Sequence, residues 1–122
     1  MIGILDVIVI DCPNPGALAA FYAEVLGVEV YSRDDDWAEI AAQVGPRPLM
    51  AFQRVQGEYT APEWPGQVVP QQIHLDIRVE DFDVAEPAVL ALGATKAGSD
   101  QETFRVYLDP AGHPFCLITP ND

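Results

Sequence analysis

The feature that most constrains the fold of this chain is an internal repeat. A residue able to cap a helix occurs at Asn14 and again at Asp81, 67 residues later. A glycine able to end a helix occurs at Gly27 and again at Gly93. A short apolar segment precedes each cap, and three strand-like segments follow each glycine. Because a fixed spacing indicates a duplicated structural unit, we expect two tandem copies of one βαβββ unit.

The first copy is expected to cover residues 1–55. Residues 4–10 are rich in β-branched side chains, which favours a buried strand. Pro15 follows the cap at Asn14, and apolar residues then recur every three or four positions up to Gly27, as on the buried face of a helix. Three strands are expected to complete this copy, at 28–32, 37–44 and 48–55.

The second copy is expected to cover residues 71–122. Residues 72–80 alternate between apolar and polar side chains, which predicts a strand with one buried face. Asp83 and Glu86 have the spacing of a capping box, and an apolar stripe follows up to Gly93. The remaining strands are expected at 94–98, 103–109 and 114–119.

Residues 56–70 join the two copies and contain both aromatic residues and prolines. Prolines stiffen the segment, so Tyr59 and Trp64 can cover an apolar cavity at low entropic cost. The segment can serve as a structural lid that packs on the sheet, as a lid that contacts a ligand, or as both. With this lid, the two copies predict a single α+β domain over 1–122, a half-barrel whose cleft between the units binds small molecules.

Charge, hydropathy and cysteine content limit the partners and the compartment that we expect for the chain. Its net charge is −13, and its six basic residues are scattered, so we expect no nucleic-acid partner. No apolar run reaches the roughly 18 residues of a membrane helix, and no basic region precedes the first apolar segment, so we expect neither membrane insertion nor secretion. Cys12 and Cys116 form no C-x-x-C pair and are expected to be reduced thiols in the cytoplasm.

Several short motifs occur in a fixed order along the chain: Phe21-Tyr22-x-x-x-Leu26-Gly27, His74-Leu75-Asp76, Leu92-Gly93-Ala94 and Asp109-Pro110-x-Gly112. In this order they resemble the vicinal oxygen chelate superfamily, which includes glyoxalases, bleomycin resistance proteins and dioxygenases. Further motifs are similar to the glyoxalase-like proteins common in actinobacteria: Ala51-Phe-Gln-Arg-Val55, Tyr59-x-x-Pro62-x-Trp64-Pro65 and Gly112-His-Pro-Phe-Cys-Leu117. The resemblance implies the half-barrel fold and a homodimer. It leaves the function open, because the superfamily includes isomerases, dioxygenases and metal-free drug-binding proteins.

The resemblance also implies where a metal would be bound. Metal-using members carry ligands early on the first strand and late on the last strand of each unit. These positions correspond to Val7 and His74, to Met50 or Phe52, and to Cys116. Only His74 is a conventional ligand, and one histidine with one cysteine leaves a four-coordinate zinc site half empty. We therefore expect no metal and no other cofactor.

Two residues remain as candidates for chemistry. His74 can be a histidine hydrogen-bonded within the sheet, a polar anchor, or a general acid or base that faces the cavity. The sequence shows no carboxylate at an obvious orienting distance from it. Cys116 can be a small buried residue or can pair with His74 as a nucleophile, although the acidic composition does not favour a thiolate.

The aromatic residues point to the class of ligand. We expect the cavity to be lined by Trp37, Phe52, Tyr59, Trp64, His74 and Cys116, which suits a planar or apolar molecule. An anionic ligand such as a glutathione conjugate would be bound poorly, because the chain has few basic residues to pair with it. The first functional hypothesis is metal-independent binding of a small apolar or aromatic molecule. The alternative is a lyase or isomerase that uses His74 as acid or base, or as its sole conventional metal ligand. The residues leave open whether the chain is an enzyme.

Overall fold

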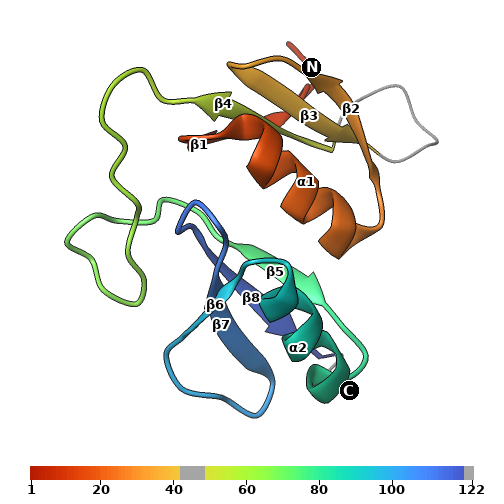
Figure 1. The fold of residues 1–122 in the computed structure, drawn as a ribbon, viewed down its shortest axis with the longest axis vertical. Helices are drawn as coiled ribbons and strands as arrows, with labels where there is room; N and C mark the ends of the chain where they lie inside the picture. Colours follow the sequence, from red (N-terminus) through yellow and green to blue (C-terminus); the bar gives the residue numbers. More distant parts are fainter. Residues whose placement is uncertain (42–48, 120–122) are drawn as a thin grey trace. The chain divides into compact units, whose positions relative to one another are not determined.

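The computed structural model describes residues 1–41 and 49–119 of the chain (Figure 1). The chain divides into two compact units, Met1–Tyr59 and Thr60–Asp122, called here the first and the second unit. Residues 60–70, expected to form part of a linker, belong to the second unit. The packing of both units into one domain stays a prediction.

The first unit contains one helix and one four-stranded sheet. Its elements in chain order are β1 (Ile8–Cys12), α1 (Pro15–Leu26), β2 (Glu29–Arg33), β3 (Trp37–Ala41) and β4 (Met50–Arg54). The sheet order is β1-β4-β3-β2, with β1 parallel to β4 and the other pairs antiparallel. The predicted βαβββ order is confirmed. The first strand begins four residues later than expected, and residues 42–48 of the expected strands lie outside the described residues.

The second unit repeats this arrangement. Its elements are β5 (Leu75–Arg78), α2 (Phe82–Ala91), β6 (Thr95–Ala97), β7 (Phe104–Leu108) and β8 (Pro114–Ile118). The sheet order is β5-β8-β7-β6, again with the first and last strands parallel. Since each strand has its counterpart at the same place in the other sheet, the duplication predicted from the sequence is confirmed (Figure 1).

The predicted caps position both helices. The side chain of Asn14 accepts a hydrogen bond from the amide of Ala17 at 3.2 Å, and that of Asp81 accepts one from the amide of Asp83 at 2.8 Å. The predicted capping box at Asp83 and Glu86 is wrong, because the cap is Asp81. Glu86 instead accepts a hydrogen bond from the hydroxyl of Tyr107 in β7 at 2.7 Å.

Each helix covers one face of the sheet in its own unit. In the first unit, Phe52 of β4 is fully buried and stacks on Tyr22 of α1, with ring centroids 5.8 Å apart. In the second unit, Tyr107 of β7 stacks on its register partner Phe115 of β8 at 5.6 Å and donates its hydroxyl hydrogen bond to Glu86 of α2. Because strand side chains alternate between faces, the neighbours of these core residues point to the opposite face of each sheet. In the described residues, no helix is long and apolar enough to cross a membrane.

The turn between β7 and β8 is held by a buried carboxylate. Asp109 is only 4 % exposed, and its Oδ1 accepts hydrogen bonds from the amides of Ala111 and His113 at 2.9 and 3.0 Å. Gly112 has a φ of +88°, and a Cβ at this position would lie 2.7 Å from the Cβ of Ala61. A glycine is therefore required where the turn meets the segment that leads to Trp64.

Candidate functional site

Strand alternation brings the polar groups of the second unit to the sheet face opposite α2. Tyr107 points to α2, where it contacts Glu86. Its neighbour Val106 therefore points away from the helix. Cys116 is the register partner of Val106 on one side and of Asp76 on the other. Since partners directly opposite each other in neighbouring strands share a face, Cys116 and Asp76 both lie on the face opposite α2.

A pocket of about 360 Å³ lies on this face. Its residues all belong to the second unit. The apolar wall is formed by Trp64, Phe104 and Ile118, and Thr103 and Thr119 contribute hydroxyl groups. The most polar part of the lining is formed by His74, Asp76 and Cys116, called here the polar cluster.

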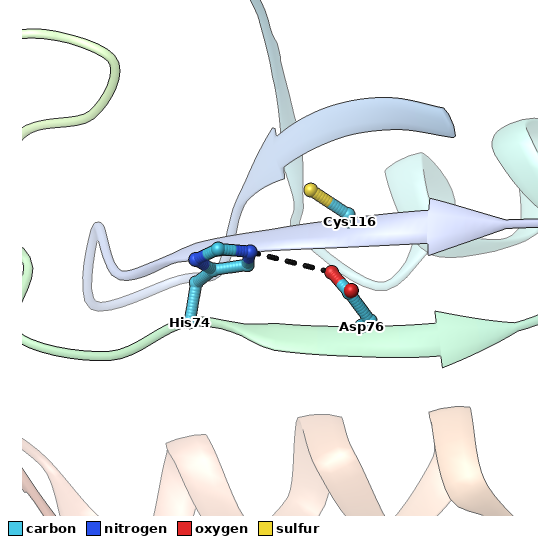
Figure 2. Close-up of side chains that lie close together, drawn as sticks. All are labelled: His74, Asp76 and Cys116. Atoms are coloured by element: carbon cyan, nitrogen blue, oxygen red, sulfur yellow. Dashed lines mark ion pairs between the residues drawn. The ribbon is translucent and has the colours of Figure 1, made fainter. Parts of the chain in front are cut away.

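The polar cluster joins two adjacent strands (Figure 2). His74 and Asp76 are two residues apart, so their side chains point to the same face, and Nε2 of His74 lies 3.3 Å from Oδ1 of Asp76. One ligand atom from each residue of the cluster lies within 4.8 Å of the other two. The side chains of His74 and Asp76 are 30 % and 54 % exposed, whereas Cys116 is buried. The cluster is thus reachable from the pocket and anchored in the core.

Trp64 fixes one face of the imidazole. The rings of Trp64 and His74 are stacked, with centroids 4.7 Å apart and an angle of 16° between their planes. The segment carrying Trp64 is closed by a hydrogen bond from the amide of Glu63 to the carbonyl oxygen of Val69 at 2.7 Å. Because Trp64 covers the ring and Asp76 contacts its edge, the orientation of His74 is defined before any ligand binds.

The electrostatics of the cluster keep Cys116 protonated. Burial is the main cause, and together with the charge and hydrogen-bonding of the nearby Asp76 carboxylate it raises the pKa of the thiol to about 11. At neutral pH only about one thiol in ten thousand is then ionised. A thiol held protonated in this way is a poor nucleophile at neutral pH.

The first unit carries no comparable cluster among its described residues. Val9 pairs with Ala51 in the same parallel register in which Asp76 pairs with Cys116. The register therefore makes Ala51 the counterpart of Cys116, and corrects the expectation that this position is Met50 or Phe52. Neither Val9 nor Ala51 has a donor atom in its side chain, and the same holds for Val7, the counterpart of His74.

Three of the six residues expected to line a ligand cavity lie together around the pocket: Trp64, His74 and Cys116. Trp37, Phe52 and Tyr59 belong to the first unit, where Phe52 is fully buried against α1. Asp76 was missed, because no carboxylate was recognised at an obvious orienting distance from His74 in the sequence, yet Asp76 contacts the imidazole. The signal was present in the sequence, because two polar residues two positions apart in a strand share a face.

Comparison with known proteins agrees with this architecture. A family model described as "Glyoxalase-like domain" matches residues 7–118. The chain belongs to the glyoxalase-like domain family. No curated protein matches this glyoxalase-like chain in sequence. Membership confirms the resemblance to the wider superfamily, whereas the actinobacterial subfamily stays a prediction.

Solved structures share the glyoxalase-like fold at low sequence identity. A glyoxalase/bleomycin resistance protein/dioxygenase family enzyme from Burkholderia phytofirmans PsJN is 20 % identical, with a TM-score of 0.70 over 96 % of this chain and 98 % of that chain. The antibiotic binding protein TnmS3 from Streptomyces sp. CB03234 is 19 % identical, with a TM-score of 0.52 over 99 % and 100 %. The bleomycin-binding protein from Streptomyces verticillus, solved with copper(II)-bleomycin, is 20 % identical, with a TM-score of 0.54 over 99 % and 100 %.

The superfamily implies a metal ion, and the polar cluster fits one. Catalytic zinc sites use three protein ligands at about 2.0–2.3 Å and leave a fourth position open. Donor atoms in such a site are about 3–4 Å apart, so the donors of the cluster, all within 4.8 Å, need to move little to meet an ion. The half-empty pair of His74 and Cys116 expected from the sequence therefore has a third potential ligand in Asp76.

Proposed function

We propose that this glyoxalase-like protein binds a small, largely apolar molecule with a planar part in the pocket of its second unit, and that this binding requires no metal ion. The observation that carries the proposal is the Trp64 ring, which is stacked on His74 at the border of a pocket with apolar walls. The antibiotic-binding and bleomycin-binding neighbours have the same fold, which supports a binding role.

The pocket walls favour apolar and aromatic ligands. Phe104 and Ile118 face the pocket together with Trp64, and covering such side chains contributes about 1.5–3 kcal/mol each when they become fully buried. Stacking of a planar ligand on an aromatic ring adds about 0.5–1.5 kcal/mol. The volume of about 360 Å³ is near the lower end of small-molecule sites, which favours a compact ligand.

Charge restricts the ligand further. Asp76 contributes a carboxylate to the pocket, and neither lysine nor arginine is among the described residues that line it. The chain as a whole carries a net charge of −13. An anion would therefore be repelled, and the ligand is a neutral or cationic molecule. The hydroxyl groups of Thr103 and Thr119 and the imidazole of His74 serve as its hydrogen-bond partners.

Metal independence is supported by the chemistry of the pocket walls. Trp64, Phe104 and Ile118 would cover the ligand through apolar and ring contacts, and none of these three side chains needs an ion to do so. The counterpart positions Val7, Val9 and Ala51 supply no ligand from the first unit. The organic ligand therefore meets a preformed surface.

The proposal is tested with Nile red, a neutral planar dye, titrated in the presence of EDTA. We expect saturable fluorescence enhancement that is weakened at least about tenfold by Phe104→Ala. Tyr31→Ala serves as the matched control, because Tyr31 is an exposed aromatic residue of the first unit, and this variant should bind like the wild type. Loss of binding in EDTA, or equal binding by the Phe104→Ala variant, would contradict the proposal.

A second candidate function is proton transfer by His74 in a lyase or isomerase. The contact between Nε2 and Asp76 favours it, because an oriented imidazole beside a carboxylate suits a general acid or base. Under this alternative, His74→Ala abolishes turnover of a substrate and leaves its affinity within about twofold. A loss of affinity alone would favour the binding function.

We also propose a cytoplasmic homodimer. The cytoplasmic location is supported by the cysteines, because neither Cys12 nor Cys116 is in a disulfide. The homodimer rests on the resemblance to the superfamily. Sedimentation equilibrium should give twice the mass of 13.3 kDa, and a monomer across the concentration series would refute the dimer.

A further inference from the structure

We propose that the pocket of the second unit selects organic cations, and that Asp76 pairs with an ammonium group whose attached planar part lies against Trp64 and Phe104. This inference rests on the proposed function and deepens it, because it names the class of ligand and the residue that selects it. The selected class is a protonated or quaternary amine on a compact apolar framework.

The Asp76 carboxylate has capacity for a further partner. Its side chain is 54 % exposed, and its Oδ1 lies 3.3 Å from Nε2 of His74. The Cys116 thiol is a second hydrogen-bond partner. An ionised carboxylate offers about four positions for hydrogen bonds, so these two neighbours leave room for a cation that enters the pocket.

The basic residues of the second unit leave this charge uncompensated within the pocket. Lys96 and Arg105 both contact Glu86 of α2, so they lie on the other face of the sheet. Arg78 shares the face of Asp76, because it is two residues further along β5, but it is exposed and is not among the described residues that line the pocket. With a neutral imidazole, the described lining therefore carries one negative charge.

Desolvation distinguishes a cation from a neutral ligand. A ligand that fills the pocket removes water from the Asp76 carboxylate, and this lost hydration has a cost unless a counter-charge replaces it. An ammonium group supplies that counter-charge, whereas a hydrocarbon group of the same shape does not. The pocket therefore discriminates by charge as well as by shape.

The aromatic walls favour the same class of ligand. Trp64 and Phe104 line the pocket together with Asp76. Aromatic rings attract cations through their electron-rich faces, and tryptophan does so most strongly. The net charge of −13 adds a long-range attraction that raises the concentration of cations near the protein. The rings, the carboxylate and the overall charge therefore act in the same direction.

The first test compares two ligands that are matched in shape and differ in charge. One is a naphthylethyl trimethylammonium ion, and the other is its carbon isostere, in which a tert-butyl group replaces the trimethylammonium group. Equilibrium dialysis in EDTA at pH 8 gives the ratio of their affinities for the wild type. We expect the ammonium ion to bind at least about tenfold more tightly, and a ratio near one would overturn the proposal.

A variant of Asp76 identifies the selecting residue. Asp76→Asn removes the charge and keeps the shape of a half-exposed side chain, and it should lower the affinity ratio at least about fivefold. Asp83→Asn is the matched control, because it removes the same charge from a side chain that is 89 % exposed on α2, and its ratio should stay within about twofold of the wild-type ratio. Because both ligands are measured on each variant, any effect of the substitution that is common to both cancels. An unchanged ratio in Asp76→Asn, or equal falls in both variants, would refute the role of Asp76.

Salt provides a second readout, which needs no variant. Dissolved ions screen the attraction between charges, so an increase of NaCl from about 50 mM to about 500 mM should weaken binding of the ammonium ion several-fold. Binding of the carbon isostere should stay within about twofold over the same range. Equal responses of the two ligands would contradict charge recognition.

The proposed function and this inference can be told apart when they fail. Absence of Nile red binding in EDTA refutes the binding function, and the inference fails with it. Saturable Nile red binding together with equal affinities for the ammonium ion and its isostere refutes the cation preference alone.

Discussion

Trp64 lies almost parallel to the imidazole of His74, with 16° between the ring planes and 4.7 Å between the centroids. This contact joins the segment that carries Trp64 to His74, the residue directly before β5, which is one of the two strands beside the polar cluster. One aromatic ring therefore both borders the pocket and orients its histidine, which makes Trp64 the residue on which ligand affinity should depend most.

Replacement of Trp64 tests this dependence. Trp64→Ala should weaken Nile red binding by at least about tenfold, because the stacking surface and the restraint on His74 are lost together. Trp64→Phe retains a planar ring and should recover most of the affinity. Fluorescence titrations of both variants in EDTA measure the effect. Equal affinities in Trp64→Ala and Trp64→Phe would show that the ring has no role in binding.

The reactivity of Cys116 should follow its raised pKa. In metal-free protein carrying Cys12→Ala, alkylation by iodoacetamide at pH 7 should be slow and should accelerate as the pH rises toward about 11, because the thiolate is the reacting species. Asp76→Asn removes the negative charge beside the thiol and should speed the reaction at neutral pH. Mass spectrometry follows the modification. A fast reaction at pH 7 in the parent protein would contradict the assigned environment.

Glu86 should make the second unit sensitive to acid. The hydrogen bond from Tyr107, followed by that from Lys96, lowers the pKa of Glu86 below its ordinary value of 4.5. The stabilisation by the carboxylate is therefore present above about pH 4.5 and is lost as the pH falls through the lowered value. Glu86→Gln should cost about 1 kcal/mol at pH 7 and little at strongly acidic pH.

Urea unfolding of the wild type and of Glu86→Gln across this pH range measures the difference between their free energies of unfolding. Glu102→Gln is the control, since Glu102 is an exposed residue of the same unit. A penalty for Glu86→Gln that is the same at every pH would show that the carboxylate charge is not involved.

Gly112 should tolerate a side chain less well than Gly98. Both have positive φ, +88° and +70°, so alanine at either position costs about 1 kcal/mol of conformational strain. At Gly112 the new Cβ would also lie 2.7 Å from Ala61, whereas nothing lies within 4 Å at Gly98. Gly112→Ala should therefore be more destabilising than Gly98→Ala by about 1 kcal/mol or more. Equal thermal melting temperatures would place Ala61 farther from the turn.

The fold was largely predictable because its determinants are local and occur twice. Caps at Asn14 and Asp81 and apolar stripes before Gly27 and Gly93 depend on residues close in sequence. The predicted capping box at Asp83 was wrong because the Glu86 carboxylate accepts a hydrogen bond from Tyr107 and forms an ion pair with Lys96. Both partners come from other elements of the fold.

The site was only partly predictable, because it depends on how strands pair. The counterpart of Cys116 is set by the parallel register of β1 and β4, and no local pattern distinguishes Ala51 from its neighbours Met50 and Phe52. The proximity of Asp76 to Cys116 likewise comes from pairing across the chain. The proximity of Asp76 to His74, in contrast, follows from strand alternation and could have been predicted.

The parallel register of the two sheets has a consequence for the history of the chain. A symmetric ancestor would have offered the same two facing positions in each half, yet the present sequence has Asp76 with Cys116 in one and Val9 with Ala51 in the other. The backbone thus retains a symmetry that the side chains at these positions do not share. Val9→Asp together with Ala51→Cys would install a second copy of the paired groups in the first unit, beside Glu39, the register partner of Ala51 in β3.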